Sequence, residues 1–250
     1  MKRADPGPVT HLERLAAELF EGVADDVLAA EVAGWLETSR RFRAFATTHR
    51  AKIHKKLRGT TDAAGLADVR AELRVAQLLL ADPRVELAYE AHGSGRPGPD
   101  FTVSVRGERT FDLEVTRLRA VPAHGGPLLA KLRQFPPSVP NLLVIALAGD
   151  RADALDVAAI VRDLRARADR KDDAFFAARG FDDARGFYDR LLRLGGVVVW
   201  CEAAVGEGRL SRWTNGSARI ALPERAVRIV LAALASVDAN DLTAPRAPSG

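Results

Sequence analysis

Asp100 and Glu114 are the residues whose types and spacing most directly suggest chemistry. A turn near Gly107 joins two expected strands, and counting back from it places Asp100, at the start of the first strand, near the far end of the second. Alternation along that second strand puts Glu114 and Thr116 on one face, so Asp100 and Glu114 should meet. Two carboxylates, a neighbouring backbone carbonyl and water suit Mg²⁺ or Mn²⁺, which neutralise a phosphodiester and lower the pKa of an attacking water.

A glycine pattern just before Asp100 suggests a competing function. Gly93-x-Gly95-x-x-Gly98 has the spacing of a dinucleotide fingerprint, in which a helix begins after the glycines and its amides face a pyrophosphate. Here Pro97 and Pro99 lack amide hydrogens, and a strand follows instead of a helix. We therefore interpret this segment as a connection between two strands.

Four segments in a fixed order carry a resemblance to a known family. They are Glu72 in a helix, Pro99-Asp100 at a strand start, Glu114-Val115-Thr116 on the paired strand, and a following helix with Lys131 and Gln134. This order resembles the PD-(D/E)XK nuclease superfamily. Residues 191–200, 215–218 and 222–223 resemble a poorly characterised bacterial branch of it, and the similarity covers residues 62–235.

The resemblance implies a restriction-endonuclease-like α/β fold and a role for each matching residue. Asp100 and Glu114 would bind the metal together with the main-chain carbonyl of Val115. Glu72 would reach the metal through water or orient the neighbouring groups.

The sequence departs from the family at Thr116, where the family has its lysine. Lys131, one of six lysines in the chain, either supplies that charge from the next helix or is an ordinary exposed residue. Gln134, one turn further on, either touches the same phosphate or caps the helix before Pro136-Pro137. Both alternatives stay open from the sequence.

A basic block between residues 40 and 58 contains no acid. Such a block can follow a phosphate backbone, and it can equally be a solvated helix face. Its members are Arg40, Arg41, Arg43, Arg50, Lys52, Lys55, Lys56 and Arg58.

The elements that must position these residues follow from hydrophobic periodicity. Helices are expected over residues 10–58, 66–80, 128–135, 153–170 and 223–236, and residues 59–62 are expected to supply a break and a cap before the second of them. Strands are expected over residues 85–89, 101–105, 110–118, 141–147, 196–201 and 209–214. We therefore expect an N-terminal helical appendage (1–60), a nuclease-like domain with a mixed central sheet flanked by helices (61–238), and a disordered tail (239–250).

Composition sets the broad class. The chain has 250 residues, 47% of them hydrophobic, and a net charge of +4, so it can bury a large core and favours anionic partners. Its single cysteine excludes an intramolecular disulfide, and no signal peptide or membrane segment is expected, which indicates a cytoplasmic protein.

The predicted function is a Mg²⁺- or Mn²⁺-dependent nuclease that hydrolyses phosphodiester bonds in DNA. The alternative is a catalytically inactive nuclease-fold protein that binds nucleic acid or a protein partner. A third interpretation makes the N-terminal helices a homodimer interface.

Overall fold

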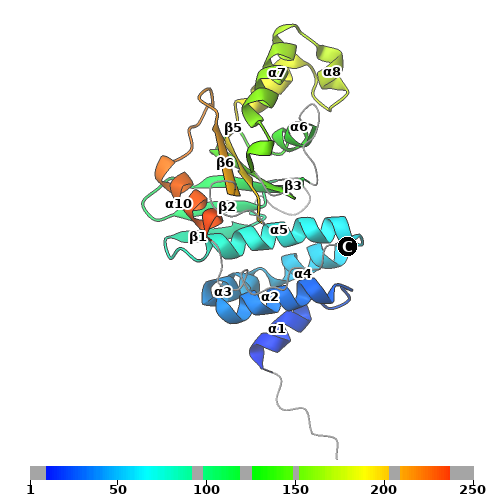
Figure 1. The fold of residues 1–250 in the computed structure, drawn as a ribbon, viewed down its shortest axis with the longest axis vertical. Coiled ribbons are helices and arrows are strands. Elements are labelled where there is room, and N and C mark those ends of the chain that lie inside the picture. Colours follow the sequence, from blue (N-terminus) through cyan, green and yellow to red (C-terminus); the bar gives the residue numbers. More distant parts are fainter. Residues whose placement is uncertain (1–9, 92–97, 119–125, 149–151, 203–208, 237–250) are drawn as a thin grey trace, which may run out of the picture.

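The computed structural model describes residues 10–91, 98–118, 126–148, 152–202 and 209–236. Figure 1 shows a layered α/β molecule in which the sheet lies between the long helix α5 and the helices α6 and α7, with the N-terminal helices beyond α5. The α/β class and the mixed sheet flanked by helices are therefore confirmed. The predicted tail, the glycines at 93 and 95, and Pro97 lie outside the described residues.

The central sheet has six strands in the order β1-β2-β3-β4-β5-β6. The β3–β4 and β4–β5 pairs are parallel, and the other three pairs are antiparallel. All six strands were predicted, with boundaries that differ by at most two residues. They are β1 Val85–Tyr89, β2 Phe101–Val105, β3 Phe111–Leu118, β4 Asn141–Leu147, β5 Leu194–Trp200 and β6 Leu210–Thr214.

Most of the described helices begin after a short polar side chain that accepts a hydrogen bond from a first-turn amide. Asp62 accepts a hydrogen bond from Gly65 N at 2.6 Å, which confirms the predicted cap of α5. Asp156 caps α7 in the same way, so the helix expected from residue 153 is divided into a 3₁₀ turn and α7. The helices are α1 His11–Leu19, α2 Asp26–Thr38, α3 Arg40–Thr48, α4 Arg50–Gly59, α5 Ala63–Leu79, α6 Gly126–Leu132, η2 Ala152–Ala154, α7 Val157–Asp169, α8 Asp173–Ala177, α9 Ala184–Leu191 and α10 Glu224–Ala235.

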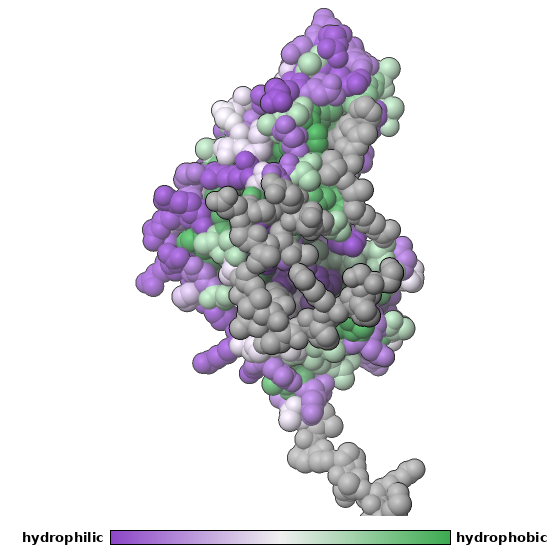
Figure 2. Space-filling view, in the orientation of Figure 1, coloured by the Kyte–Doolittle hydropathy of each residue, from purple (hydrophilic) through white to green (hydrophobic). Residues whose placement is uncertain are grey.

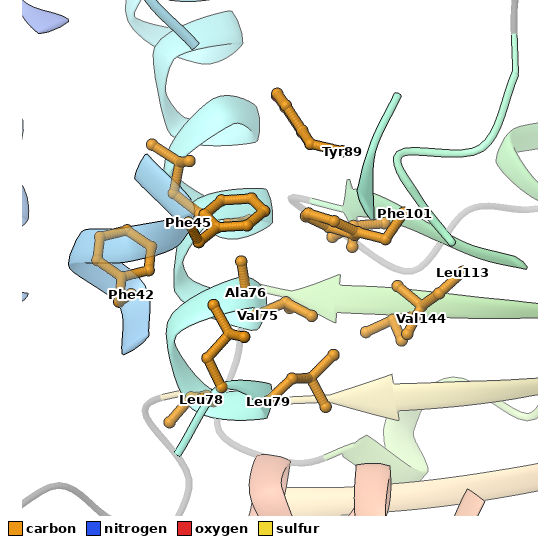
Figure 3. Packing of buried hydrophobic residues seen from close by; sticks show 14 of the residues in the cluster. Phe42, Phe45, Val75, Ala76, Leu78, Leu79, Tyr89, Phe101, Leu113 and Val144 are labelled. Atoms are coloured by element: carbon orange, nitrogen blue, oxygen red, sulfur yellow. The ribbon is translucent and has the colours of Figure 1, made fainter. Parts of the chain in front are cut away.

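One face of the sheet shares a single apolar core with α1–α5 and α10. Figure 3 shows Phe45 of α3 directed toward Phe101 of β2, and the Phe42 ring stacks on Phe45. Phe45 and Phe101 have ring centroids 6.3 Å apart. The helices before residue 60 are therefore packed into the same core as the sheet.

The other face of the sheet is covered by α6, α7, α8 and α9 around a second core. Strand alternation directs Leu143, Ile145 and Val199 into this core, while Leu142, Val144 and Val198 enter the first one. Hydrophilic residues gather at the end of the molecule formed by α7 and α8 (Figure 2). None of the described helices is long and apolar enough to cross a membrane.

Candidate active site

The site lies where β3 continues past the start of β2. The β2–β3 ladder ends at the Phe101–Leu113 pair, whereas β3 stays paired with β4 through Leu118. Extending the antiparallel register by one residue puts Asp100 opposite Glu114. The expectation that these two acids meet is confirmed.

Asp100 and Glu114 hold each other in place through backbone amides. Asp100 N donates to Glu114 Oε2 at 3.2 Å, and Val115 N donates to Asp100 Oδ2 at 2.8 Å. Each carboxylate thus has one oxygen fixed by the main chain. The orientation of both acids is built into the strand pairing, not left to flexible side chains.

Glu72 of α5 and Tyr89 of β1 lie next to these two acids, because Lys56 contacts both Glu72 and Asp100. The Tyr89 hydroxyl donates to Glu72 Oε2 at 3.2 Å. Glu72 and Asp100 are each 7% exposed and Glu114 is 2% exposed. Three acids are therefore largely withdrawn from water in one place.

Two lysines neutralise these acids. Lys131 of α6 donates to Glu114 Oε1, so the structure brings this lysine into the site. Lys56 of α4 lies 2.5 Å from Glu72 Oε2 and 3.3 Å from Asp100 Oδ1. The sequence placed Lys56 in a nucleic-acid-binding block, but its ammonium faces the acids.

The pKa values of the acids reflect their burial. Burial and then the nearby Asp100 raise the pKa of Glu72 to about 8, against the opposing effect of Lys56. Burial and then Asp100 raise the pKa of Glu114 to about 7, with Lys131 opposing them. Both shifts show that the charged forms of Glu72 and Glu114 are disfavoured in the fold, and carboxyl groups with raised pKa values are common at functional sites.

The pKa values of the two lysines are also raised, which favours their charged forms. Burial acts to lower the pKa of Lys56, but attraction to Glu72 and Asp100 outweighs it, so the pKa lies above its ordinary value. At Lys131, burial also acts to lower the pKa, but attraction to Glu114 outweighs burial, so this pKa is raised as well. Both ammonium groups are therefore firmly charged.

The residues around Lys131 occupy different places. Thr116 is half-buried on β3. Arg117 points to the opposite face, 3.9 Å from Asp68 of α5, and so lies away from Glu114 and Lys131. Gln134 is half-buried in the turn after α6, where its backbone amide donates to Lys131 O.

Much of the basic block is engaged within the protein. Arg41 donates to Pro83 O and Val85 O, Arg43 to Leu36 O and Glu37 O, and Lys52 to Tyr89 O and Glu90 O. Arg50 pairs with Glu18 at 2.5 Å. The members that are exposed and not seen in these contacts are Arg40, Lys55 and Arg58.

The donor atoms suit a hard divalent cation in kind, since they are carboxylate oxygens. As the side chains stand, however, no group of three or more His, Cys, Asp or Glu within the described residues is arranged to hold a metal. Ammonium groups lie against Asp100 Oδ1 and Glu114 Oε1, the carboxylate oxygens that do not accept from the backbone amides.

Sequence reasoning missed Tyr89 and gave Lys56 a different role. Lys56 lies three residues after the buried Ile53 and next to the buried Leu57, a spacing that puts it at the edge of the inner face of α4. That signal was available from the sequence. Nothing in the sequence distinguished Tyr89 from an ordinary strand aromatic.

Comparisons of this chain with protein-family models, with curated proteins and with solved structures each found no match.

Proposed function

We propose that this protein is a metal-dependent nuclease with a restriction-endonuclease-like fold of the PD-(D/E)XK kind, hydrolysing phosphodiester bonds in DNA. The observation that carries the proposal is the meeting of Glu72, Asp100, Glu114 and Lys131. They come from a helix, a strand start, a paired strand and a following helix. The order of these elements and the mixed sheet support the proposed fold.

Asp100 and Glu114 would hold Mg²⁺ or Mn²⁺, with the Val115 carbonyl as a further ligand. The bound ion would supply charge neutralisation and a more acidic water. The chain's own groups do the rest. The two backbone amides orient the carboxylates, Glu72 accepts from Tyr89 and orients the neighbouring groups, and Lys131 offers positive charge to the phosphate oxygens in place of a lysine at Thr116.

The test compares isosteric variants of the acids. Asp100→Asn and Glu114→Gln keep shape but remove charge, and each should lose Mn²⁺ binding by calorimetry and lose metal-dependent cleavage of linear, supercoiled and single-stranded DNA by several orders of magnitude. Asp68→Asn, an exposed acid on α5, is the matched control and should keep both. Full cleavage by Asp100→Asn would refute the mechanism.

A second candidate is a catalytically inactive nuclease-fold protein that binds nucleic acid or a protein partner. It is favoured by the two ammonium groups that already neutralise the acids, and by Thr116 in place of the family lysine. DNA binding would then depend steeply on salt without cleavage. Reversing the charge of the exposed Arg40, Lys55 and Arg58 should weaken that binding, and unchanged affinity would exclude this surface.

A homodimer through the N-terminal helices stays a prediction that light scattering can test.

A further inference from the structure

Lys56 comes from the N-terminal helices, yet its ammonium lies among the acids of the candidate active site. It contacts Glu72 Oε2 at 2.5 Å, Asp100 Oδ1 at 3.3 Å and Glu90 Oε1 at 3.6 Å. It also lies 5.5 Å from the centre of the Tyr89 ring, a cation–π distance. One positive charge thus bridges acids from α5, from the start of β2 and from the end of β1.

The oxygen that Lys56 contacts on Asp100 is the one that the backbone leaves. Asp100 Oδ2 accepts from Val115 N, so Oδ1 is the oxygen directed at a cation, and Lys56 is the cation it meets. Glu114 repeats this pattern, with Oε2 on Asp100 N and Oε1 on Lys131. A divalent ion that binds these acids through Asp100 Oδ1 and Glu114 Oε1 has to share or take the oxygens that the two lysines now contact.

The helix that carries Lys56 is fastened to the site. Lys52, one turn earlier on α4, donates to the carbonyls of Tyr89 and Glu90 at 2.8 and 2.9 Å. Glu90 has a backbone φ of +45°, which residues other than glycine rarely adopt. Its amide donates to Asp100 O at 2.8 Å. The end of β1 is therefore clamped between α4 and the segment that presents Asp100.

Lys55, the neighbouring residue, shows what an ordinary lysine on this helix does. It is exposed, whereas the side chain of Lys56 is only 26% exposed. The burial of Lys56 costs hydration, which its acidic partners and the Tyr89 ring offset. Its position is explained by those partners.

We propose that Lys56 is the resident counterion of the Glu72–Asp100–Glu114 cluster, holding the place of a divalent cation and giving way when one binds. Helix α4 then contributes a residue to the site, because Lys56 competes with the cation for the carboxylates and so sets the affinity for that cation. The inference rests on the proposed function for the identity of the cation, but it concerns the competition between the ammonium and Mn²⁺, which is measurable without any cleavage.

The experiment is calorimetric titration of the full chain with Mn²⁺ alone, comparing wild type, Lys56→Met and Lys55→Met. Loss of one unit charge beside the carboxylates should tighten Mn²⁺ binding about tenfold in Lys56→Met. Lys55→Met should bind Mn²⁺ as wild type does. Lys56→Gln, which keeps a hydrogen-bond donor, replaces Lys56→Met if circular dichroism shows that the methionine variant does not fold.

The outcomes separate this inference from the proposed function. Tighter Mn²⁺ binding by the Lys56 variant supports the counterion role, even if no DNA is cleaved by any variant. Binding by the Lys56 variant where wild type shows none also supports it, while counting against wild type as a metal enzyme. Equal or weaker binding, or none in either protein, overturns the inference.

Discussion

Replacing Glu72 by glutamine should make the metal-free protein more stable at mildly alkaline pH. Glu72 is 7% exposed and lies near Asp100 and Glu114, so its charged form is unfavourable in the folded state. The amide keeps the size of the side chain and can still accept from Tyr89. Lys56 keeps Asp100 and Glu90 as partners.

The sign and size follow from the pKa shift. The pKa of Glu72 rises from 4.5 to about 8, because of burial and then the nearby Asp100. A carboxyl with a raised pKa in the folded state contributes stability below its unfolded pKa, and this is lost as the pH rises toward the folded value. At about 1.4 kcal/mol per pH unit, this one group should lower the free energy of unfolding by about 3 kcal/mol between pH 5.5 and pH 8.

Urea unfolding in the presence of a chelator, at both pH values, measures this change. Wild type should lose stability between pH 5.5 and pH 8 relative to Glu72→Gln, by about 3 kcal/mol. Asp68→Asn, which removes an exposed acid one turn earlier on α5, should follow the wild-type trend. Parallel pH dependences in wild type and Glu72→Gln would show that Glu72 is not held protonated by its surroundings.

Three further predictions concern the fold that positions the site. Removing the α5 cap with Asp62→Ala should cost about 1 kcal/mol in urea unfolding, and an unchanged midpoint would mean that α5 does not depend on it. Phe101→Ala, in the core directly after Asp100, should cost about 3–5 kcal/mol, and a loss below about 1 kcal/mol would show that this core collapses around the gap. Gly196→Ala places a Cβ 2.9 Å from Trp213 O and should lower the midpoint of thermal unfolding. Gly216→Ala meets no atom within 4 Å of the new Cβ and should leave the midpoint unchanged. Equal midpoints for the two variants would contradict the close approach of β5 and β6.

The parts of the site that sequence predicted are those fixed by local rules. The turn near Gly107 and the alternation of β2 and β3 determine which residues face each other, so the meeting of Asp100 and Glu114 could be counted out in advance. The cap of α5 at Asp62 is equally local. The strand boundaries were close for the same reason, because apolar runs end at turn residues.

The parts that sequence did not predict depend on how α4 packs against β1. Lys56 and Asp100 are 44 residues apart in the chain, and no periodicity links them. Treating residues 40–58 as one basic surface ignored the carbonyls at the ends of α2 and β1, which engage Arg43, Arg41 and Lys52. Charge in a sequence shows what a residue can pair with, but the tertiary contacts determine whether its partner is a phosphate or the protein itself.

The composition of the cluster argues that it is there for chemistry more than for stability. A buried ion pair rarely stabilises a fold more than apolar groups of the same size would, because each charge loses its hydration. Here three acids and two lysines meet beside the end of a strand ladder, and backbone amides rather than side chains orient Asp100 and Glu114. Because the amides hold the carboxylates independently of the cation that they face, the arrangement should survive an exchange of counterions. If the proposed function holds, the site would release an ammonium and accept a metal without rebuilding its framework, as metal-dependent hydrolysis requires.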